Sequence, residues 1–287
     1  MPFTPLIWRL RTRTLSTEGH SLIMGVVNVT PDSFSDGGRF WDTDAAVAHG
    51  VALTEAGADL IDIGGESTRP GADPVGADEE LQRVLPVVTK LAGEGIAVSV
   101  DTSKADVAAA AIEAGAEVVN DVSALRATGM AQVCVAMEVG VVLMHMQGTP
   151  QTMDVDPQYE DVVAEVGDFL VDRAQFAERE GIDPARVAID PGVGFGKDAA
   201  HNMALLGNLD VLVATGYPVL VGSSRKRFIS DVMDAAGFAR SLVDRDVATA
   251  ATVATSIMQG AAIVRVHDVA TAAQVGRMAD AIVRASH

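Results

Sequence analysis

The chain repeats one arrangement along most of its length: a short apolar segment, a polar residue at its carboxyl end, a glycine-containing loop and a helix. The clearest example is the segment VAIDPGVGFGK at residues 187–197, where the apolar run ends at Asp190. Pro191 ends the strand because it has no backbone N–H, and the three glycines that follow allow a tight turn. The pattern recurs at residues 61–65, 98–101, 118–121 and 264–267. Repeated units of this kind are typical of a parallel sheet covered by helices.

Eight such segments are predicted to be strands. They are residues 22–29, 60–63, 97–100, 117–120, 141–146, 187–189, 218–221 and 262–266. Helices are predicted between them: from Asp44, over 78–91, from about residue 103, over 129–138, in a long segment ending near Gly181, and as a pair within 231–260. Eight units over about 265 residues predict a single-domain α/β fold, a (β/α)8 TIM barrel spanning residues 1–287. Long loops are expected after the first two strands, and residues 1–21 are expected to form a plug or hairpin that closes the barrel bottom. A doubly wound open sheet is the alternative, but the first loop lacks the Gly-x-Gly-x-x-Gly pattern of that fold.

Composition limits the classes of partner. The net charge is −18, so nucleic acid and anionic membranes are not expected partners. The single cysteine, Cys134, excludes a disulfide within the chain. Neither a signal peptide nor an apolar run of roughly 20 residues is apparent, which favours a soluble cytoplasmic protein.

Polar residues at strand ends are the candidate functional residues, because the carboxyl ends of barrel strands meet at one mouth. In chain order they are Asn28, Asp62, Asp101, Asn120, Met144, Asp190, Ser224 with Lys226, and Arg265 with His267. Carboxylates accept hydrogen bonds, a carboxamide both donates and accepts, and a lysine donates to a carbonyl. Such a pocket suits a flat heteroaromatic amide, such as a pterin or a purine. The alternative for a single aspartate, Asp101 above all, is capping of the following helix.

Arg265 and His267 lie two residues apart on a predicted strand, so both side chains face the same side. A buried arginine is costly unless it meets an anion, and phosphate or pyrophosphate is the natural ligand. The alternatives are an internal ion pair of Arg265 with Asp36 or Asp62, and a loop-bridging role for His267. Asn28 could supply one oxygen to a magnesium ion held otherwise by phosphate and water.

Three glycine-containing loops carry further candidates. Residues 28–38, NVTPDSFSDGG, have the length and polarity of a lid, or else form a mobile surface loop. Residues 64–71, GGESTRPG, form a second mobile loop in which Arg69 meets a carboxylate or is simply solvated. Residues 221–227, VGSSRKR, place a turn at Gly222 and three basic residues at a helix start, where a free Ser224 hydroxyl would bind an anion or carboxylate. Ser224 is disfavoured as a nucleophile because no Gly-x-Ser-x-Gly elbow is present.

An ordered set of signatures between about residues 23 and 283 resembles the dihydropteroate synthase family. The set comprises NVTPDSFSDGG, GGESTRPG, SVDT, NDV, LMHMQG, DPGVGFGK, SRK and RVHD. No single string is decisive, but the eight in this order are highly specific. The resemblance implies a pterin-binding barrel that joins (7,8-dihydropterin-6-yl)methyl diphosphate to p-aminobenzoate by a dissociative displacement, releasing diphosphate and 7,8-dihydropteroate.

The resemblance also implies a role for each matching residue. It places the pterin on Asp101, Asn120, Asp190 and Lys226, with Met144 and Phe195 packing near it. It places diphosphate and Mg2+ on Asn28, Arg265 and His267, and p-aminobenzoate among Thr68, Arg69, Pro70 and Ser224, beneath Phe34. Gly222 is expected to be a further substrate-binding residue. Asp101, Asp190, Lys226, Arg265 and His267 would be the catalytic residues. A homodimer formed through the late helices and competition by sulfonamides are implied as well. Trp41 and residues 39–43 depart from the family pattern, which puts the discrimination between p-aminobenzoate and sulfonamides in question. The alternatives are a related barrel that transfers a methyl group from methyltetrahydrofolate, and a catalytically degenerate pterin-binding paralogue.

Overall fold

The computed structural model describes residues 5–30, 43–68, 71–153, 155–238 and 242–286. Eight parallel strands form one sheet: β3 (Leu22–Asn28), β4 (Leu60–Gly64), β5 (Val98–Asp101), β6 (Val118–Asp121), β7 (Gly140–Met144), β8 (Val187–Asp190), β9 (Leu220–Val221) and β10 (Ile263–Val266). Their order is β8-β7-β6-β5-β4-β3-β10-β9. The two end strands meet through a parallel bridge between Ile189 and Val219, which closes the sheet into a barrel. The predicted (β/α)8 architecture is therefore confirmed.

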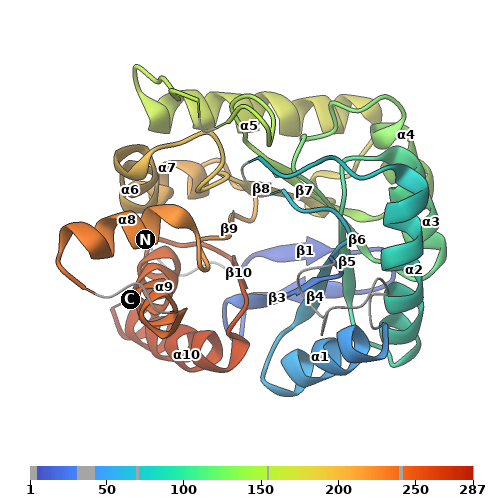
Figure 1. Cartoon of the computed structure of the whole chain (residues 1–287), viewed down its shortest axis with the longest axis horizontal. Coiled ribbons are helices and arrows are strands. Elements are labelled where there is room, and N and C mark those ends of the chain that lie inside the picture. The colour runs from blue at the N-terminus through green and yellow to red at the C-terminus, as the bar shows by residue number, and fades with distance from the viewer. Residues whose placement is uncertain (1–4, 31–42, 69–70, 154, 239–241, 287) are drawn as a thin grey trace.

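Helices surround the barrel (Figure 1). They are α1 (Thr43–Glu55), α2 (Ala77–Gly93), α3 (Ala105–Glu113), α4 (Met130–Met137), α5 (Val162–Glu180), α6 (Ala199–Gly207), α7 (Leu209–Val213), α8 (Arg227–Ala235), α9 (Leu242–Met258) and α10 (Val269–Ala285). Most lie within a few residues of the predicted ranges. The sequence pattern did not resolve α6 and α7 between β8 and β9, and it placed the start of α3 about two residues early.

A hairpin precedes the barrel. Strands β1 (Ile7–Arg9) and β2 (Thr14–Ser16) pair antiparallel, as expected for the N-terminal segment. Trp8 and Leu10 are almost completely buried in a cluster with side chains from the amino-terminal halves of the strands, including Leu22, Leu60 and Val118. The indole Nε1 of Trp8 donates a hydrogen bond of 2.9 Å to the carbonyl of Arg186, which begins the approach to β8. The hairpin therefore packs against the end of the barrel opposite the carboxyl ends of the strands.

Side chains alternate between the two faces of each strand, and this alternation decides which residues reach the barrel interior. In β4, Ile61 and Ile63 belong to the large cluster shared with the helices, whereas Leu60 belongs to the interior cluster. Asp62 therefore faces inward, one layer above Leu60. The same alternation in β5, β8 and β10 turns Asp101, Asp190 and Arg265 toward the interior.

Within the described ranges, the structure contains no helix that is both long and apolar enough to span a membrane.

Candidate active site

The carboxyl ends of neighbouring strands bring the predicted polar residues together. The sheet pairs Gly64 with Asp101, Asp101 with Asn120, and Met144 with Asp190. Asp101, Asn120 and Asp190 are each less than one-tenth exposed. Parallel pairing therefore brings these carboxylates and the carboxamide together at the carboxyl ends of the strands, inside the barrel mouth.

Arg265 on β10 joins two carboxylates across the barrel. Its Nε donates to Asp62 Oδ2 at 2.6 Å, and its Nη2 donates to Asp101 Oδ2 at 2.8 Å. The internal ion pair with Asp62, which the sequence left open as an alternative, is thus present, and a second pair with Asp101 accompanies it. The other partner considered, Asp36, lies outside the described residues. Two ion pairs on separate nitrogens hold the guanidinium plane in one orientation.

Asp62 links Arg265 to Asn120. Its side chain is fully buried, and its Oδ2 also accepts a hydrogen bond of 3.0 Å from Asn120 Nδ2. Its other oxygen, Oδ1, has no hydrogen-bond partner within the described part of the chain. Asp62 therefore orients a residue predicted to bind the pterin and a residue predicted to bind diphosphate.

Burial and neighbouring charges shift the pKa values of Asp101 and Arg265. Burial raises the pKa of Asp101 to about 7; Arg265 opposes this effect, while Asp62 and other carboxylates add to it. Burial alone would lower the pKa of Arg265, but its two carboxylate partners outweigh that effect and raise it. One guanidinium thus serves two carboxylates, and the excess negative charge favours a proton on Asp101. The side chain of Asp101 is engaged with Arg265, and the structure shows no side-chain cap on α3, so helix capping does not account for it.

Asp190 and Lys226 form the opposite side of the mouth. Asp190 Oδ1 accepts a hydrogen bond of 2.7 Å from the backbone N–H of Gly192. Lys226 Nζ donates to the carbonyl of Val193 and lies 4.2 Å from the centre of the Phe195 ring. Burial lowers the pKa of Lys226 to about 7, although the nearby Asp190 opposes this shift. Burial raises the pKa of Asp190, which Lys226 opposes in turn.

An apolar wall adjoins these charges. Met144 and Phe195 are buried in a small cluster with Val122, Met146 and Met153, separate from the main core. Gly222 lies next to two basic side chains, because a Cβ added there would be 3.7 Å from Arg265 Cβ and 3.9 Å from Lys226 Nζ. A flat ring between the wall and the polar residues would meet both apolar and hydrogen-bonding surfaces.

Ser224 does not present a free hydroxyl at a helix N-terminus, so that expectation was wrong. Its Oγ accepts from the backbone N–H of His267 at 3.2 Å and lies 3.0 Å from His267 Nδ1. Helix α8 begins only at Arg227, after the serine. The three basic residues of this segment also diverge: Arg225 binds both carboxylate oxygens of Asp246 on α9, Lys226 enters the mouth and Arg227 is exposed. A left-handed backbone at Arg225, with φ of 59°, separates their directions.

Asn28 ends β3 beside Asp101. A Cβ added at Gly64 would be 3.5 Å from Asn28 Oδ1 and 3.8 Å from Asp101 Oδ2, so both oxygens face the same glycine. Among the described residues, no three His, Cys, Asp or Glu side chains gather closely enough to hold a metal ion. One amide oxygen beside a carboxylate suits a magnesium ion that takes its remaining ligands from a diphosphate and water.

The predicted arylamine residues are only partly described. Thr68 lines a hollow of about 430 Å³ between the loops that follow β4, β5, β6 and β7. Phe34, Trp41, Arg69 and Pro70 lie outside the described residues, as do residues 31–42 of the first loop.

Sequence reasoning assigned no site role to two buried polar residues, His145 and Lys197. Lys197 was visible only as the basic end of the glycine-rich loop. The contact between the two was not visible, because His145 and Lys197 are 52 residues apart in the chain and bond at 2.9 Å.

Comparisons with known proteins agree with this geometry. Residues 24–267 match the family described as pterin binding enzyme. The dihydropteroate synthase of Mycobacterium leprae is 49% identical over 86% of this chain and 88% of its own length. The Xanthomonas albilineans dihydropteroate synthase solved with 4-aminobenzoic acid superposes with a TM-score of 0.90 at 46% identity, covering 97% of this chain and 98% of that one. The Yersinia pestis dihydropteroate synthase solved with a sulfonamide drug superposes with a TM-score of 0.90 at 39% identity, covering 98% and 100%. The chain belongs to the dihydropteroate synthase family.

Proposed function

We propose that the chain condenses (7,8-dihydropterin-6-yl)methyl diphosphate with p-aminobenzoate, giving 7,8-dihydropteroate and diphosphate. The observation that carries this proposal is the convergence of Asp101, Asn120, Asp190 and Lys226 near Arg265 at the mouth of the barrel, where the strands have their carboxyl ends. These groups provide carboxylate, carboxamide and ammonium partners for a pterin ring, and a fixed guanidinium for an anionic leaving group.

Four polar residues bind the pterin in this proposal. Asp101 and Asp190 accept hydrogen bonds from ring and exocyclic N–H groups, Asn120 both donates and accepts, and Lys226 donates to the ring carbonyl. Met144 and Phe195 supply the apolar surface on which the ring lies.

The reaction breaks the bond between the methylene carbon and the diphosphate oxygen, and it forms a bond from that carbon to the arylamine nitrogen. Positive charge develops on the pterin as diphosphate leaves, and the carboxylates of Asp101 and Asp190 stabilise it. Arg265 and His267 stabilise the departing diphosphate, since Arg265 is already held in place by two carboxylates. The arylamine nitrogen then loses a proton to solvent, so no covalent enzyme intermediate is needed. Closure of the loops at 28–38 and 64–71 would exclude water from the cation.

The arylamine would lie among Thr68, Arg69, Pro70 and Ser224, with Phe34 closing over it. Ser224 supports this assignment indirectly, because its hydroxyl positions His267 and so joins the two predicted substrate regions. Sulfonamides would compete for the same region. Magnesium would be held by Asn28 and by the diphosphate itself, and when bound it would neutralise charge on the leaving group.

We place the whole chain in one pterin-binding domain whose N-terminal segment closes the barrel bottom, and we place the protein in the cytoplasm as a homodimer. The hairpin contacts of Trp8 support the first assignment. Exposed apolar side chains on α9 and α10, including Met258, Met278 and Ile282, support the dimer. Light scattering of the wild type and of Met278→Glu tests it, since a charge at that position should shift a dimer toward monomer.

The deciding experiment measures diphosphate release from the pterin diphosphate in the presence of magnesium, with and without p-aminobenzoate. Release that requires the arylamine and is reduced by a sulfonamide supports the synthase. Pterin binding without release would instead identify a catalytically degenerate binder.

A further inference from the structure

Lys197, at the end of the loop that follows β8, is buried without any role in the proposed reaction. Its residue is 7% exposed. The Nζ atom lies 2.9 Å from His145 Nδ1 and donates to the carbonyls of Phe195 at 3.0 Å and Gly192 at 3.1 Å, while the His145 carbonyl is 3.4 Å away. Among the described residues, no carboxylate forms an ion pair with it. Because Lys197 binds only carbonyls and an imidazole, its contacts hold the surrounding backbone in place and do not neutralise a carboxylate.

The state of His145 agrees with this arrangement. Burial and the neighbouring Lys197 lower the pKa of His145 to about 3, so its ring is neutral and its Nδ1 can accept. Burial lowers the pKa of Lys197 to about 7, although Asp190 opposes this shift. The His145 ring is itself held by an edge contact with Phe169 at 4.9 Å between centroids. Lys197 is therefore attached to a rigid point at the end of β7.

The carbonyls that Lys197 binds belong to the same loop as the groups that hold Lys226. Gly192 and Phe195 accept from Lys197, whereas the intervening Val193 carbonyl accepts from Lys226. The Phe195 ring lies against Lys226 Nζ, and a Cβ on Gly194 would approach Lys226 Cδ to 2.7 Å. The loop is thus held between two lysines, one buried behind it and one in the mouth.

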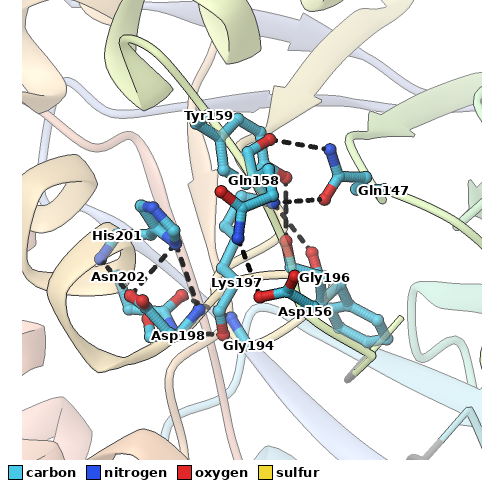
Figure 2. A network of polar contacts seen from close by, with 11 residues as sticks. Gln147, Asp156, Gln158, Tyr159, Gly194, Gly196, Lys197, Asp198, His201 and Asn202 are labelled. Atoms are coloured by element: carbon cyan, nitrogen blue, oxygen red, sulfur yellow. Dashed lines mark hydrogen bonds and ion pairs between the residues drawn. The ribbon is translucent and has the colours of Figure 1, made fainter. Parts of the chain in front are cut away.

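Further polar contacts hold the loop in the same place (Figure 2). The Tyr159 hydroxyl donates to the Gly196 carbonyl at 2.8 Å. Fully buried Asn202 accepts from the Gly194 N–H at 2.7 Å and donates to the Lys197 carbonyl at 3.2 Å. Gly192 permits the close approach on which Lys197 depends, because a Cβ there would lie 1.8 Å from the His145 carbonyl oxygen.

We propose that Lys197 is a positioning residue for the pterin site: it fastens the loop after β8 to the end of β7, and thereby orients Phe195 and the Val193 carbonyl that hold Lys226. The inference rests on the proposed function in that Lys226 and Phe195 are taken to contact the pterin. It adds a residue that never touches substrate but acts through Lys226.

The test measures, by calorimetry, the binding of 6-hydroxymethylpterin to the wild-type chain and to the Lys197→Met, Lys226→Met and double variants. Arg186→Met is the matched control: Arg186 is another buried cation, also 7% exposed and bound to a backbone carbonyl, at the opposite end of β8. Lys197→Met should weaken pterin binding about tenfold, within the range for losing hydrogen bonds from a charged donor. The KM for p-aminobenzoate should stay within about twofold, because none of the residues proposed to bind the arylamine belongs to this loop. Arg186→Met should lower Tm comparably but leave pterin affinity within about twofold.

The double-mutant cycle separates positioning from general stabilisation. In the Lys226→Met background, Lys197→Met should weaken binding by less than about twofold, since the group it positions is gone. Full additivity, or unchanged pterin affinity in Lys197→Met alone, would overturn the proposal. If Lys197→Met does not fold, Lys197→Gln and Tyr159→Phe serve in its place; each should weaken binding about threefold, and unchanged affinity in both would refute the role. Because the ligand carries no diphosphate, a wild type that binds it but releases no diphosphate would contradict the proposed function while leaving this inference intact.

Discussion

Replacing Asp62 with asparagine tests how the site holds Arg265. Asp62 Oδ2 accepts from Arg265 Nε at 2.6 Å and from Asn120 Nδ2 at 3.0 Å. An asparagine oxygen can take the same place, and its amide nitrogen then replaces Oδ1, which has no partner among the described residues. The substitution therefore removes the negative charge while keeping the shape and both contacts.

The expected loss follows from those contacts. A hydrogen bond that involves a charged group contributes about 1.5–3 kcal/mol, and asparagine retains a weaker neutral version of it. Arg265 also keeps its bond to Asp101, so the guanidinium is not left without a counter-charge. We expect kcat/KM for the pterin diphosphate to fall by about ten- to thirtyfold, or about 1.4–2 kcal/mol. Asp62→Ala should lower the free energy of unfolding by about 3–5 kcal/mol, because it leaves the Arg265 and Asn120 donors without this acceptor and opens a cavity.

Steady-state diphosphate release measures this effect, with Asp59→Asn as the control. Asp59 lies just before β4, at the opposite end of the barrel, and accepts from His20 and from the backbone of Ile23 at 2.8 Å each. The control should retain kcat/KM within about twofold. The acid limb of the pH profile should also move to lower pH in Asp62→Asn, because Asp62 is one of the groups that raise the pKa of Asp101. Unchanged kcat/KM together with an unchanged acid limb would show that Asp62 neither orients Arg265 nor influences Asp101.

Three further outcomes are expected. The pH dependence of the wild-type kcat/KM should be bell-shaped with a maximum near pH 7. Asp101 must be ionised and Lys226 must be protonated for activity, and both groups have a pKa of about 7. A flat profile between pH 6 and 9 would contradict this. Asp101→Asn should abolish most activity yet raise Tm at pH 8, with no gain below about pH 4, as differential scanning fluorimetry can show. The sign follows because the folded state, with its raised pKa, binds more protons than the unfolded chain, so stability is lost as pH rises toward 7; an equal or lower Tm at pH 8 would refute it. Asn28→Ala should raise the magnesium concentration for half-maximal activity about tenfold while leaving 6-hydroxymethylpterin affinity unchanged, and an unaltered magnesium titration would exclude Asn28 as a ligand.

Much of the fold could be predicted because its signals are local. A strand with period-two alternation specifies its own inward face, so Asp62, Asp101 and Asp190 could be expected inside a barrel before any contact was known. The sequence pattern was least accurate where an element is very short or where two helices follow each other closely. The short β9 has only two residues in ladder pairing, and the connection from β8 contains two helices of nine and five residues that the apolar pattern did not separate.

The sequence by itself therefore determined the barrel, the residue types at its mouth and the family signatures, because these depend on neighbouring residues and on their order. Only the tertiary structure decided which groups pair there. Arg265 had two possible carboxylate partners in the sequence, and barrel closure brought it to Asp62, 203 residues away, and to Asp101 as well. Closure likewise joined Ser224 to His267 and Lys197 to His145. Such contacts cross between strands and loops far apart in the chain, and their geometry exists only once the eight strands are in register.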